Sequence, residues 1–378
     1  LEELTATASS LAFHFENQRF DAVNLAAAEF QDIESSMSAG HPCFVANSGR
    51  IGFNSEEYGR FAPEANTQFP LEWVAVSKER AHFCSIGVNY AEHMERELGA
   101  ERLQQFEQSL SDLNLHPDDY LYMPIHPWQW SNRIATVFAD EIARRRIVRL
   151  GQSCDRYQAQ QSIRTLYNVS TPSRAYVKTS LSVLNMGFMR GLSPEYMAAT
   201  PAINQWVHET LKDDGILCAS NFTVLREFAA VGYRHPVFEH GAPKGSPRRK
   251  MLAALWRESP QLSAGEQAMT MAALLHRDRD GDPLLRSLIQ RSGLEANDWL
   301  ERYLDVYLVP IVHCFFAYEL AFMPHGENLI LRFENGVPIG AFIKDIGEEV
   351  IVFNTDREMP ALVQRIAQSF SDDVRVLS

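Results

Sequence analysis

The chain has 378 residues, of which 46% are hydrophobic and 22% are charged, a composition that predicts a globular protein of two or three domains. Its formal net charge of −13 argues against a nucleic-acid binder, because such proteins present a positive surface to the phosphates. The five cysteines are scattered and include no CxxC pair. This argues against a disulfide framework or a zinc site and favours a reducing, cytoplasmic compartment.

The periodicity of apolar residues predicts a mixture of helices and strands. Helical spacing dominates both ends of the chain, and aromatic, alternating runs lie between them. The predicted elements are helices over 1–38, 88–118, 196–212 and from Asn297 toward Phe322, a strand within 70–87 and a loop over 234–250.

The most apolar stretch, 306–323, is interrupted by Pro310, His313 and Glu319. A membrane-spanning helix needs about 20 consecutive, mainly apolar residues. The interruptions therefore predict a buried helix, and we expect no membrane partner.

Residues 175–184 alternate with a period of two, which predicts one strand. On this strand Lys178 shares a face with Tyr176, Ser180 and Ser182. Such a face either borders solvent or lines a polar cleft.

The Asn-Gly pair at 335–336, flanked by apolar runs, is a strong hairpin signal. With a two-residue loop, the register places Asp345 opposite Gly326, beside His325 and Glu327. Together with the neighbouring amide, this end of the hairpin offers ligands for a hard cation and its phosphates. The alternative is a simple turn with a loop-capping aspartate.

The chain has no GxGxxG, Walker A, HExxH or GxSxG motif. The candidates for a functional site are therefore two sets of polar residues. Lysine and arginine neutralise phosphate oxygens, and carboxylate and amide oxygens bind Mg²⁺. We interpret the sets as a site for a magnesium nucleotide, in which the histidine donates to developing charge. The first set is Ser162, Arg164, Thr165, Lys178 and Arg190, and the second is His325, Glu327, Asn328 and Asp345.

Together these motifs resemble the NRPS-independent siderophore synthetases, the aerobactin-synthetase-like family. The resemblance covers nearly the whole chain in the family's motif order. Each motif is weakly specific, but their occurrence together in the family's order is a strong signal. The matching segments are 40–42, 49–53, 123–129, 162–165, 177–180, 325–328 and 344–345.

The resemblance implies an α+β fold with finger, palm and thumb regions built from mixed helices and antiparallel sheet. We expect a finger-like region at 1–150 with acyl- and nucleophile-side residues, a palm-like ATP-binding region at 151–355, and the start of a truncated thumb at 356–378. The family's reaction is an ATP- and Mg²⁺-dependent ligation that forms a C–N bond. A carboxylate becomes an acyl-adenylate with release of pyrophosphate, and an amine or hydroxylamine then displaces AMP.

The resemblance also implies partners and residue roles. The partners are small-molecule carboxylates, polyamine-derived substrates and a second copy of the chain in a homodimer. The implied catalytic residues are Lys178, Arg190 and His325; the ATP-binding residues are Ser162, Arg164, Thr165, Lys178, Glu327 and Asn328; the substrate-binding residues are His41, Arg50, Arg190 and His325; and the metal ligands are Asp345 and Asn328.

One departure from the family pattern lies at 43–47, where many members have a second His-Pro and a lysine and this chain has Cys-Phe-Val-Ala-Asn. It favours the subgroup that joins hydroxamate-type succinyl or citryl half-molecules. Two other functions stay open. One is a small-molecule kinase that releases ADP, because a His-Gly-acid motif followed by Asp also builds kinase metal sites. The other is a protein that binds an anion without chemistry.

Overall fold

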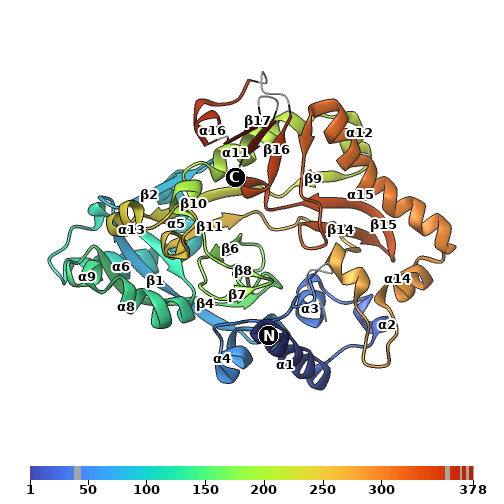
Figure 1. Cartoon of the computed structure of the whole chain (residues 1–378), viewed down its shortest axis with the longest axis horizontal. Coiled ribbons are helices and arrows are strands. Elements are labelled where there is room, and N and C mark those ends of the chain that lie inside the picture. Colours follow the sequence, from blue (N-terminus) through green and yellow to red (C-terminus); the bar gives the residue numbers. More distant parts are fainter. Residues whose placement is uncertain (38–43, 354–357, 367, 372–373, 378) are drawn as a thin grey trace.

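The computed structural model describes residues 1–37, 44–353, 358–366, 368–371 and 374–377. It has an α+β architecture in which helices surround two main sheets, as Figure 1 shows. The predicted fold class, mixed helices with antiparallel sheet, is confirmed. The division into finger, palm and thumb stays a prediction.

The larger sheet has eight strands, and every neighbouring pair is antiparallel. It combines strands from both sides of residue 150. In spatial order the strands are β2 (Ala81–Ser85), β10 (Glu227–Tyr233), β11 (Ala253–Arg257), β6 (Tyr176–Thr179), β5 (Thr165–Asn168), β4 (Ile147–Ala159), β1 (Phe69–Ser77) and β3 (Tyr120–Ile125).

The first hydrophobic core is formed by this sheet and the helices α5 (Tyr90–Leu98) and α6 (Ala100–Ser111). All nine residues of β1 are buried, because both faces of the strand are covered. Phe106 of α6 packs on Trp73 of β1 with ring centroids 6.2 Å apart. Burial of such aromatic side chains supplies most of the driving force for this core.

The second sheet has the order β12–β14–β15–β9. Its core joins residues that are far apart in sequence, because the N-terminal helices pack beside the C-terminal strands (Figure 1). The strands are β12 (Glu266–Thr270), β14 (Leu329–Glu334), β15 (Val337–Ile343) and β9 (Phe222–Val224), and the main helices of this core are α2 (Ala22–Leu25), α3 (Phe30–Ser36), α11 (Thr200–Leu211), α14 (Leu284–Ser292) and α15 (Ala296–Tyr318).

The remaining elements are short, apart from the N-terminal helix. They include a four-stranded sheet with the order β13–β16–β18–β17 and a two-stranded ribbon. The helices are α1 (Glu2–Asn17), α4 (Ser55–Phe61), α7 (Pro127–Gln129), α8 (Ala135–Val137), α9 (Ala139–Ala143), α10 (Pro194–Met197), α12 (Gly215–Ala219), α13 (Pro236–Gly241) and α16 (Ala361–Ile366), and the strands are β7 (Leu184–Asn185), β8 (Phe188–Met189), β13 (Leu320–Ala321), β16 (Val350–Val352), β17 (Gln368–Ser371) and β18 (Val374–Leu377).

The single strand predicted at 175–184 is shorter than expected. β6 ends at Thr179: the Ser180 amide still donates to Ala253 of β11, but the Leu181 amide donates to Arg190, so the chain leaves the sheet there. The segment predicted as a loop at 234–250 also contains the helix α13. At 175–184 a backbone hydrogen bond to Arg190 overrides the alternating pattern. At 234–250 hydrogen bonds to the His235 carbonyl form the first turn of the helix despite the loop-like composition.

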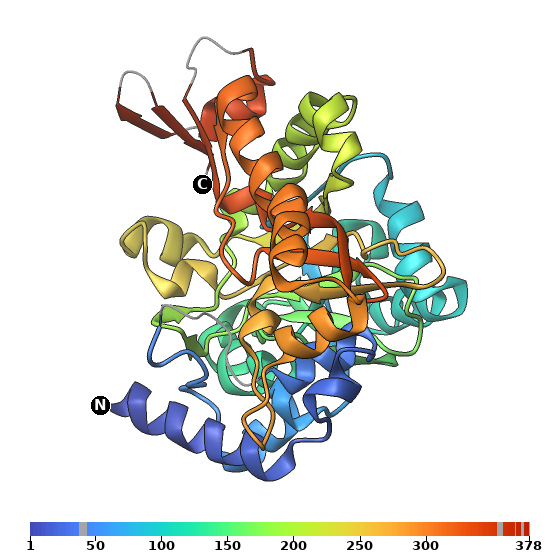
Figure 2. The same ribbon diagram turned by 90° about the vertical axis from the view of Figure 1, so that its right-hand side faces the viewer.

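Helix α15 is buried on one side only, which corrects the expectation of a buried helix. Trp299, Val306, Pro310 and Cys314 face the second core. Figure 2 shows α15, in orange, along the outside of the molecule. In the described part of the chain, no helix is both long and apolar enough to cross a membrane. The exposed apolar residues of α15 are Leu300, Leu308, Val309, Val312, Phe315 and Phe316.

The hairpin predicted at Asn335-Gly336 is confirmed, since Glu334 pairs with Val337 across the turn. Both turn residues have positive φ, 49° at Asn335 and 82° at Gly336, the conformation of a type I′ turn. A Cβ atom at Gly336 would also lie 2.5 Å from the carbonyl oxygen of Leu288.

We therefore expect Gly336→Ala to lower the free energy of unfolding. The left-handed conformation alone costs an L-residue roughly 1–2 kcal/mol, and the contact with Leu288 adds to it. Urea denaturation measures the change. The matched control is Gly59→Ala in α4, where a Cβ meets nothing within 4 Å and the helix should gain roughly 0.5–1 kcal/mol. Equal stability of the two variants would contradict the role given to this turn.

Candidate active site

The end of the β14–β15 hairpin carries the acid and amide residues, in a register one residue away from the predicted one. A β-bulge lies between Arg332 and Phe333, and beyond it Leu329 pairs with Ile343. The amide of Lys344 then donates to the Asn328 carbonyl over 3.0 Å. Asp345 therefore comes opposite Glu327 and not opposite Gly326, because the bulge adds a residue to β15.

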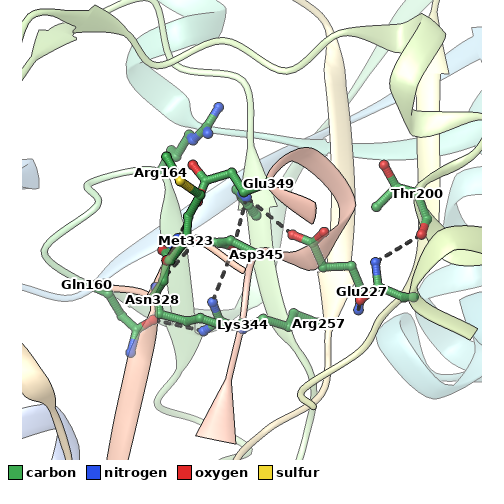
Figure 3. A network of polar contacts seen from close by, with 12 residues as sticks. Gln160, Arg164, Thr200, Glu227, Arg257, Met323, Asn328, Lys344, Asp345 and Glu349 are labelled. Atoms are coloured by element: carbon green, nitrogen blue, oxygen red, sulfur yellow. Dashed lines mark hydrogen bonds and ion pairs between the residues drawn. The ribbon is translucent and has the colours of Figure 1, made fainter. Parts of the chain in front are cut away.

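Lys178 on β6 is the link between the two sheets. Its Nζ lies 3.0 Å from Oδ1 of Asp345 and 3.2 Å from Oε1 of Glu227 on β10. The side chains of Lys178 and Glu227 are only 4% and 1% exposed. Figure 3 shows Glu227, Asp345 and Lys344 meeting at the ends of strands from both sheets. The predicted proximity of the basic and acidic sets is thus present.

Asp345 is held in its charged form. Burial alone would raise its pKa, but Lys178, Lys344 and Arg257 together keep the pKa well below its usual value. Arg257 lies 3.9 Å from Asp345 and donates to Gln160 over 3.1 Å. Asp345 also has φ of +61°, a strained conformation that the surrounding contacts must maintain.

The 160–165 loop is held in a strained turn. Ile163 has φ of +57°, which is rare for a β-branched residue. Its amide donates to Gln160 over 2.8 Å, and the Arg164 amide donates to the Ser162 carbonyl over 2.7 Å. Strain of this kind concentrates at functional sites. The turn leads directly into β5, where Thr165 pairs with Lys178.

Arg190 lies in a positive environment. Burial and the charges of Arg164 and Arg50 lower its pKa to about 10, and Glu327 and Asp345 offset them only in part. Arg190 remains charged at neutral pH, and an added anion would be stabilised there. Arg164 donates to the carbonyl of Gly191, which ties the two arginine segments together.

His325, Glu327 and Asn328 lie at the start of β14. Nδ1 of His325 accepts from the Glu327 amide over 3.2 Å, and its Nε2 is 3.9 Å from Oε2 of Glu349. Asn328 donates to Glu349 and to the Met323 carbonyl. Oε1 of Glu327 is buried and has no hydrogen-bond partner among the described residues. An unsatisfied buried carboxylate oxygen is a candidate ligand for a cation.

Of the two residues predicted for the acyl side, His41 lies outside the described residues. Arg50 is buried and already bound: its guanidinium is 2.8 Å from Glu64 and 3.3 Å from Gln161, and it also donates to Asn185. Its direct contact with a substrate stays a prediction. The positive charge of Arg50 still helps to lower the pKa of Arg190.

Several residues of the site were missed by the sequence reasoning. Glu227, Arg257 and Glu349 are charged residues beside apolar runs, and that contrast is the signal that could have found them; Glu34 and Gln160 stand in polar segments and gave no such signal. The missed residues are Glu34, Gln160, Glu227, Arg257 and Glu349.

Glu34 brings the N-terminal helix α3 into the site. It accepts from the Thr270 hydroxyl and, over 3.4 Å, from the Gln161 amide. Burial raises the pKa of Glu34, and nearby Glu327 adds to this, although Thr270, Lys344 and Gln161 act in the opposite direction. The carboxyl group therefore retains its proton to a higher pH than an exposed glutamate.

Comparison with known proteins identifies the family to which this chain belongs. Residues 29–276 match the model of the IucA / IucC family. The chain belongs to the IucA / IucC family. Residues 297–378 match a second model, described as the ferric iron reductase FhuF-like transporter. The predicted family resemblance is confirmed.

Curated relatives of the chain support the same family. The chain is 48% identical to putrebactin synthase of Shewanella over its whole length and 60% of that protein. It is 32% identical to a citryl-spermidine/3,4-dihydroxybenzoyl-citryl-spermidine:spermidine ligase of Bacillus anthracis, over 88% of the chain and 53% of the relative. The chain thus spans between half and three fifths of the length of these relatives.

Two solved structures from Klebsiella pneumoniae have the same fold. Aerobactin synthetase IucC superposes with a TM-score of 0.84 at 30% identity, covering 97% of this chain and 65% of that one. ATP-bound aerobactin synthetase IucA superposes with a TM-score of 0.71 at 23% identity, covering 91% and 61%. The second likeness shows the fold alone.

The raised pKa of Glu34 leads to a pH-dependent prediction. Stabilisation by its protonated form is complete below the ordinary value of 4.5 and is lost as the pH rises through the folded-state pKa. We expect Glu34→Gln to become more stable, relative to the unsubstituted protein, as the pH rises above 4.5, and the difference to level off above the folded-state pKa. Urea unfolding at a series of pH values measures this, with exposed Glu301→Gln as the control. A pH-independent difference would contradict the buried, protonated carboxyl.

Proposed function

We propose that the protein is an ATP-dependent siderophore synthetase of the IucA / IucC family, which joins a carboxylate to an amine or hydroxylamine as an amide. The observation that carries this proposal is the Lys178 ammonium between the carboxylates of Asp345 and Glu227. Lys344 and Arg257 also approach Asp345, at 3.5 and 3.9 Å. The membership of the family and the predicted motif roles support the same reaction.

The reaction has two steps. A carboxylate oxygen of the substrate attacks the α-phosphorus of ATP, the bond to the β-phosphate breaks, and pyrophosphate leaves. The nitrogen of the second substrate then attacks the acyl carbon, loses a proton, and displaces AMP. Both steps develop negative charge on phosphate oxygens, which preorganised cations stabilise.

Lys178, Arg164 and Arg190 hold and neutralise the phosphates in this proposal. Lys178 exchanges its carboxylate partners for phosphate oxygens, and Ser162 and Thr165 add hydroxyl donors from the adjoining loop and strand. Arg190, whose pKa is lowered to about 10, interacts electrostatically with Arg164 and Arg50 and with the acids Glu327 and Asp345. It is suited to the α-phosphate and the activated carboxylate, together with His325.

The donor set at the hairpin end fits Mg²⁺. The carboxylate of Asp345 is charged, and the amide nitrogen of Asn328 is committed to Glu349 and Met323, which directs its carbonyl oxygen elsewhere. Glu327 adds a buried oxygen without a partner among the described residues. Oxygen ligands of this kind are those that Mg²⁺ prefers, and the ion would shield the charge of the phosphates.

We further propose that the substrates are a small carboxylate and a polyamine-derived amine or hydroxylamine, such as a hydroxamate-type succinyl or citryl half-molecule. The departure at 43–47 and the names of the relatives support this choice. A homodimer stays part of the proposal.

A small-molecule kinase is the second candidate. Lys178 paired with a glutamate and a metal-binding aspartate is also the arrangement that protein kinases use around ATP. The two functions differ in the bond that breaks: a kinase releases ADP, whereas the synthetase releases pyrophosphate and AMP.

The first prediction is therefore pyrophosphate release. With Mg²⁺ and ATP, we expect pyrophosphate to appear only when a suitable carboxylate is added, tested with citrate, 2-oxoglutarate and N-hydroxy-N-succinyl diamines in a coupled phosphate assay. Nucleotide analysis of the same samples should show AMP after amine addition. Formation of ADP instead would establish the kinase, and no turnover with any of these acids would reject the proposed substrate class.

The second prediction concerns Lys178. Lys178→Ala should reduce kcat/KM by about 10²–10³, which corresponds to about 3–4 kcal/mol for one preorganised donor. Because the substitution also removes the Lys178 ammonium from the buried carboxylate of Glu227, folding is checked by circular dichroism, and Arg190→Ala serves as a second variant. Exposed Lys244→Ala is the matched control. Unchanged turnover in both site variants would count against the assignment.

A further inference from the structure

A second cluster of ligating side chains lies far from the hairpin site. Asp140 and Glu141 belong to α9, and His235 directly precedes α13. One ligand atom of each residue lies within 4.8 Å of the others. Figure 1 places α9 and α13 at the left of the molecule, across from β14 and β15. The cluster therefore needs an explanation separate from the proposed reaction.

The imidazole of His235 is the decisive feature. It is only 7% exposed, and both ring nitrogens are buried without a hydrogen-bond partner in the described part of the chain. Phe238 stacks on the ring at 4.2 Å and Phe138 meets it edge-on at 5.2 Å. The ring is thus fixed in place. A buried polar group without partners is costly and calls for a water or an ion.

The ring points toward the acidic pair. Nε2 of His235 is 3.7 Å from Oδ1 of Asp140, whose side chain is 58% exposed. Solvent therefore reaches the cluster from the Asp140 side. Glu141 accepts from Arg146 over 3.2 Å and from the Tyr233 hydroxyl. A carboxylate offers about four lone-pair positions, which leaves Glu141 with acceptor capacity for a cation.

The charges around the cluster also favour a cation. Arg146 is shared between Glu141 and Glu79, the latter at 3.5 Å. Arg234 on the other side is 3.5 Å from Glu239. Arg146 and Arg234 thus have carboxylate partners in Glu79 and Glu239, and among the described residues Asp140 forms no ion pair with an arginine. A divalent ion between Asp140, Glu141 and His235 would meet a net negative environment.

We propose that Asp140, Glu141 and His235 bind a divalent transition-metal ion of the Zn²⁺ type. One imidazole nitrogen and two carboxylate oxygens are a ligand set that Zn²⁺ accepts, with water in the remaining position. A separate cavity of about 20 Å³ beside His235 is lined by Tyr233, Arg234, Arg248 and Arg249, among others, and not by Asp140 or Glu141; it has room for one water. That water would accept from the second ring nitrogen, as partners of metal-bound histidines usually do. The ion would join α9 to the turn after β10.

The test is metal titration of the untagged protein after treatment with EDTA. We expect one equivalent of Zn²⁺ to bind in calorimetry, and Co²⁺ to give the visible absorption of a low-coordinate site with a nitrogen ligand. Asp140→Asn and His235→Gln should each weaken binding at least about tenfold, since loss even of outer partners costs 10–100-fold. Zn²⁺ should also raise the melting temperature of the unsubstituted protein more than that of either variant.

The matched control is His116→Gln. His116 is exposed, and its Nδ1 lies 3.8 Å from Oδ2 of the exposed Asp118. This variant should bind Zn²⁺ as the unsubstituted protein does. If His235→Gln fails to fold, Asp140→Asn decides, because Asp140 is largely exposed. Absence of stoichiometric binding, or equal affinity in Asp140→Asn, would overturn the proposal and leave a water as the partner of His235.

Discussion

The pairing of Lys178 with Glu227 and Asp345 joins the two main sheets at the candidate site. Lys178 and Glu227 belong to the eight-stranded sheet, whereas Asp345 follows the last strand of the hairpin in the second sheet. Removing one partner from a buried ion pair costs about 3–5 kcal/mol. The two sheets are therefore tied together at the same place where the functional residues meet, and the proposed chemistry and the stability of the fold use the same charges.

A second set of contacts extends this arrangement to the N-terminal helices. Gln161 donates to Glu34 of α3 and accepts from Arg50, so that three distant segments share one side chain. The loop that contains Gln161 continues through the strained Ile163 into Arg164. Strain is tolerated here because hydrogen bonds from several segments fix the backbone. The arginines are consequently held in place before any ligand binds, which is the condition for electrostatic stabilisation of a transition state.

Burying a charged side chain costs solvation free energy, and the site shows two responses to this cost. On one side Arg190 sits among other arginines, and its pKa falls as a result. On the other, three cations approach Asp345 and keep its pKa low, and burial raises the pKa of Glu34. The carboxylates of Glu327 and Asp345 only partly offset the positive charges of Arg164 and Arg50 at Arg190. A ligand that brings both signs, such as a metal nucleotide, satisfies both sides together.

The sequence by itself determined the mixed α+β class, the Asn335-Gly336 turn and the basic and acidic sets of the site, because turn chemistry and residue type are local properties. Only the tertiary structure decided the register beyond the bulge, where one extra residue moved Asp345 opposite Glu327. It also decided that β6 ends at Thr179 and that Glu227, Arg257 and Glu34 join the site. These features depend on pairing between strands and helices that are far apart in the chain, and no local pattern records which partners meet.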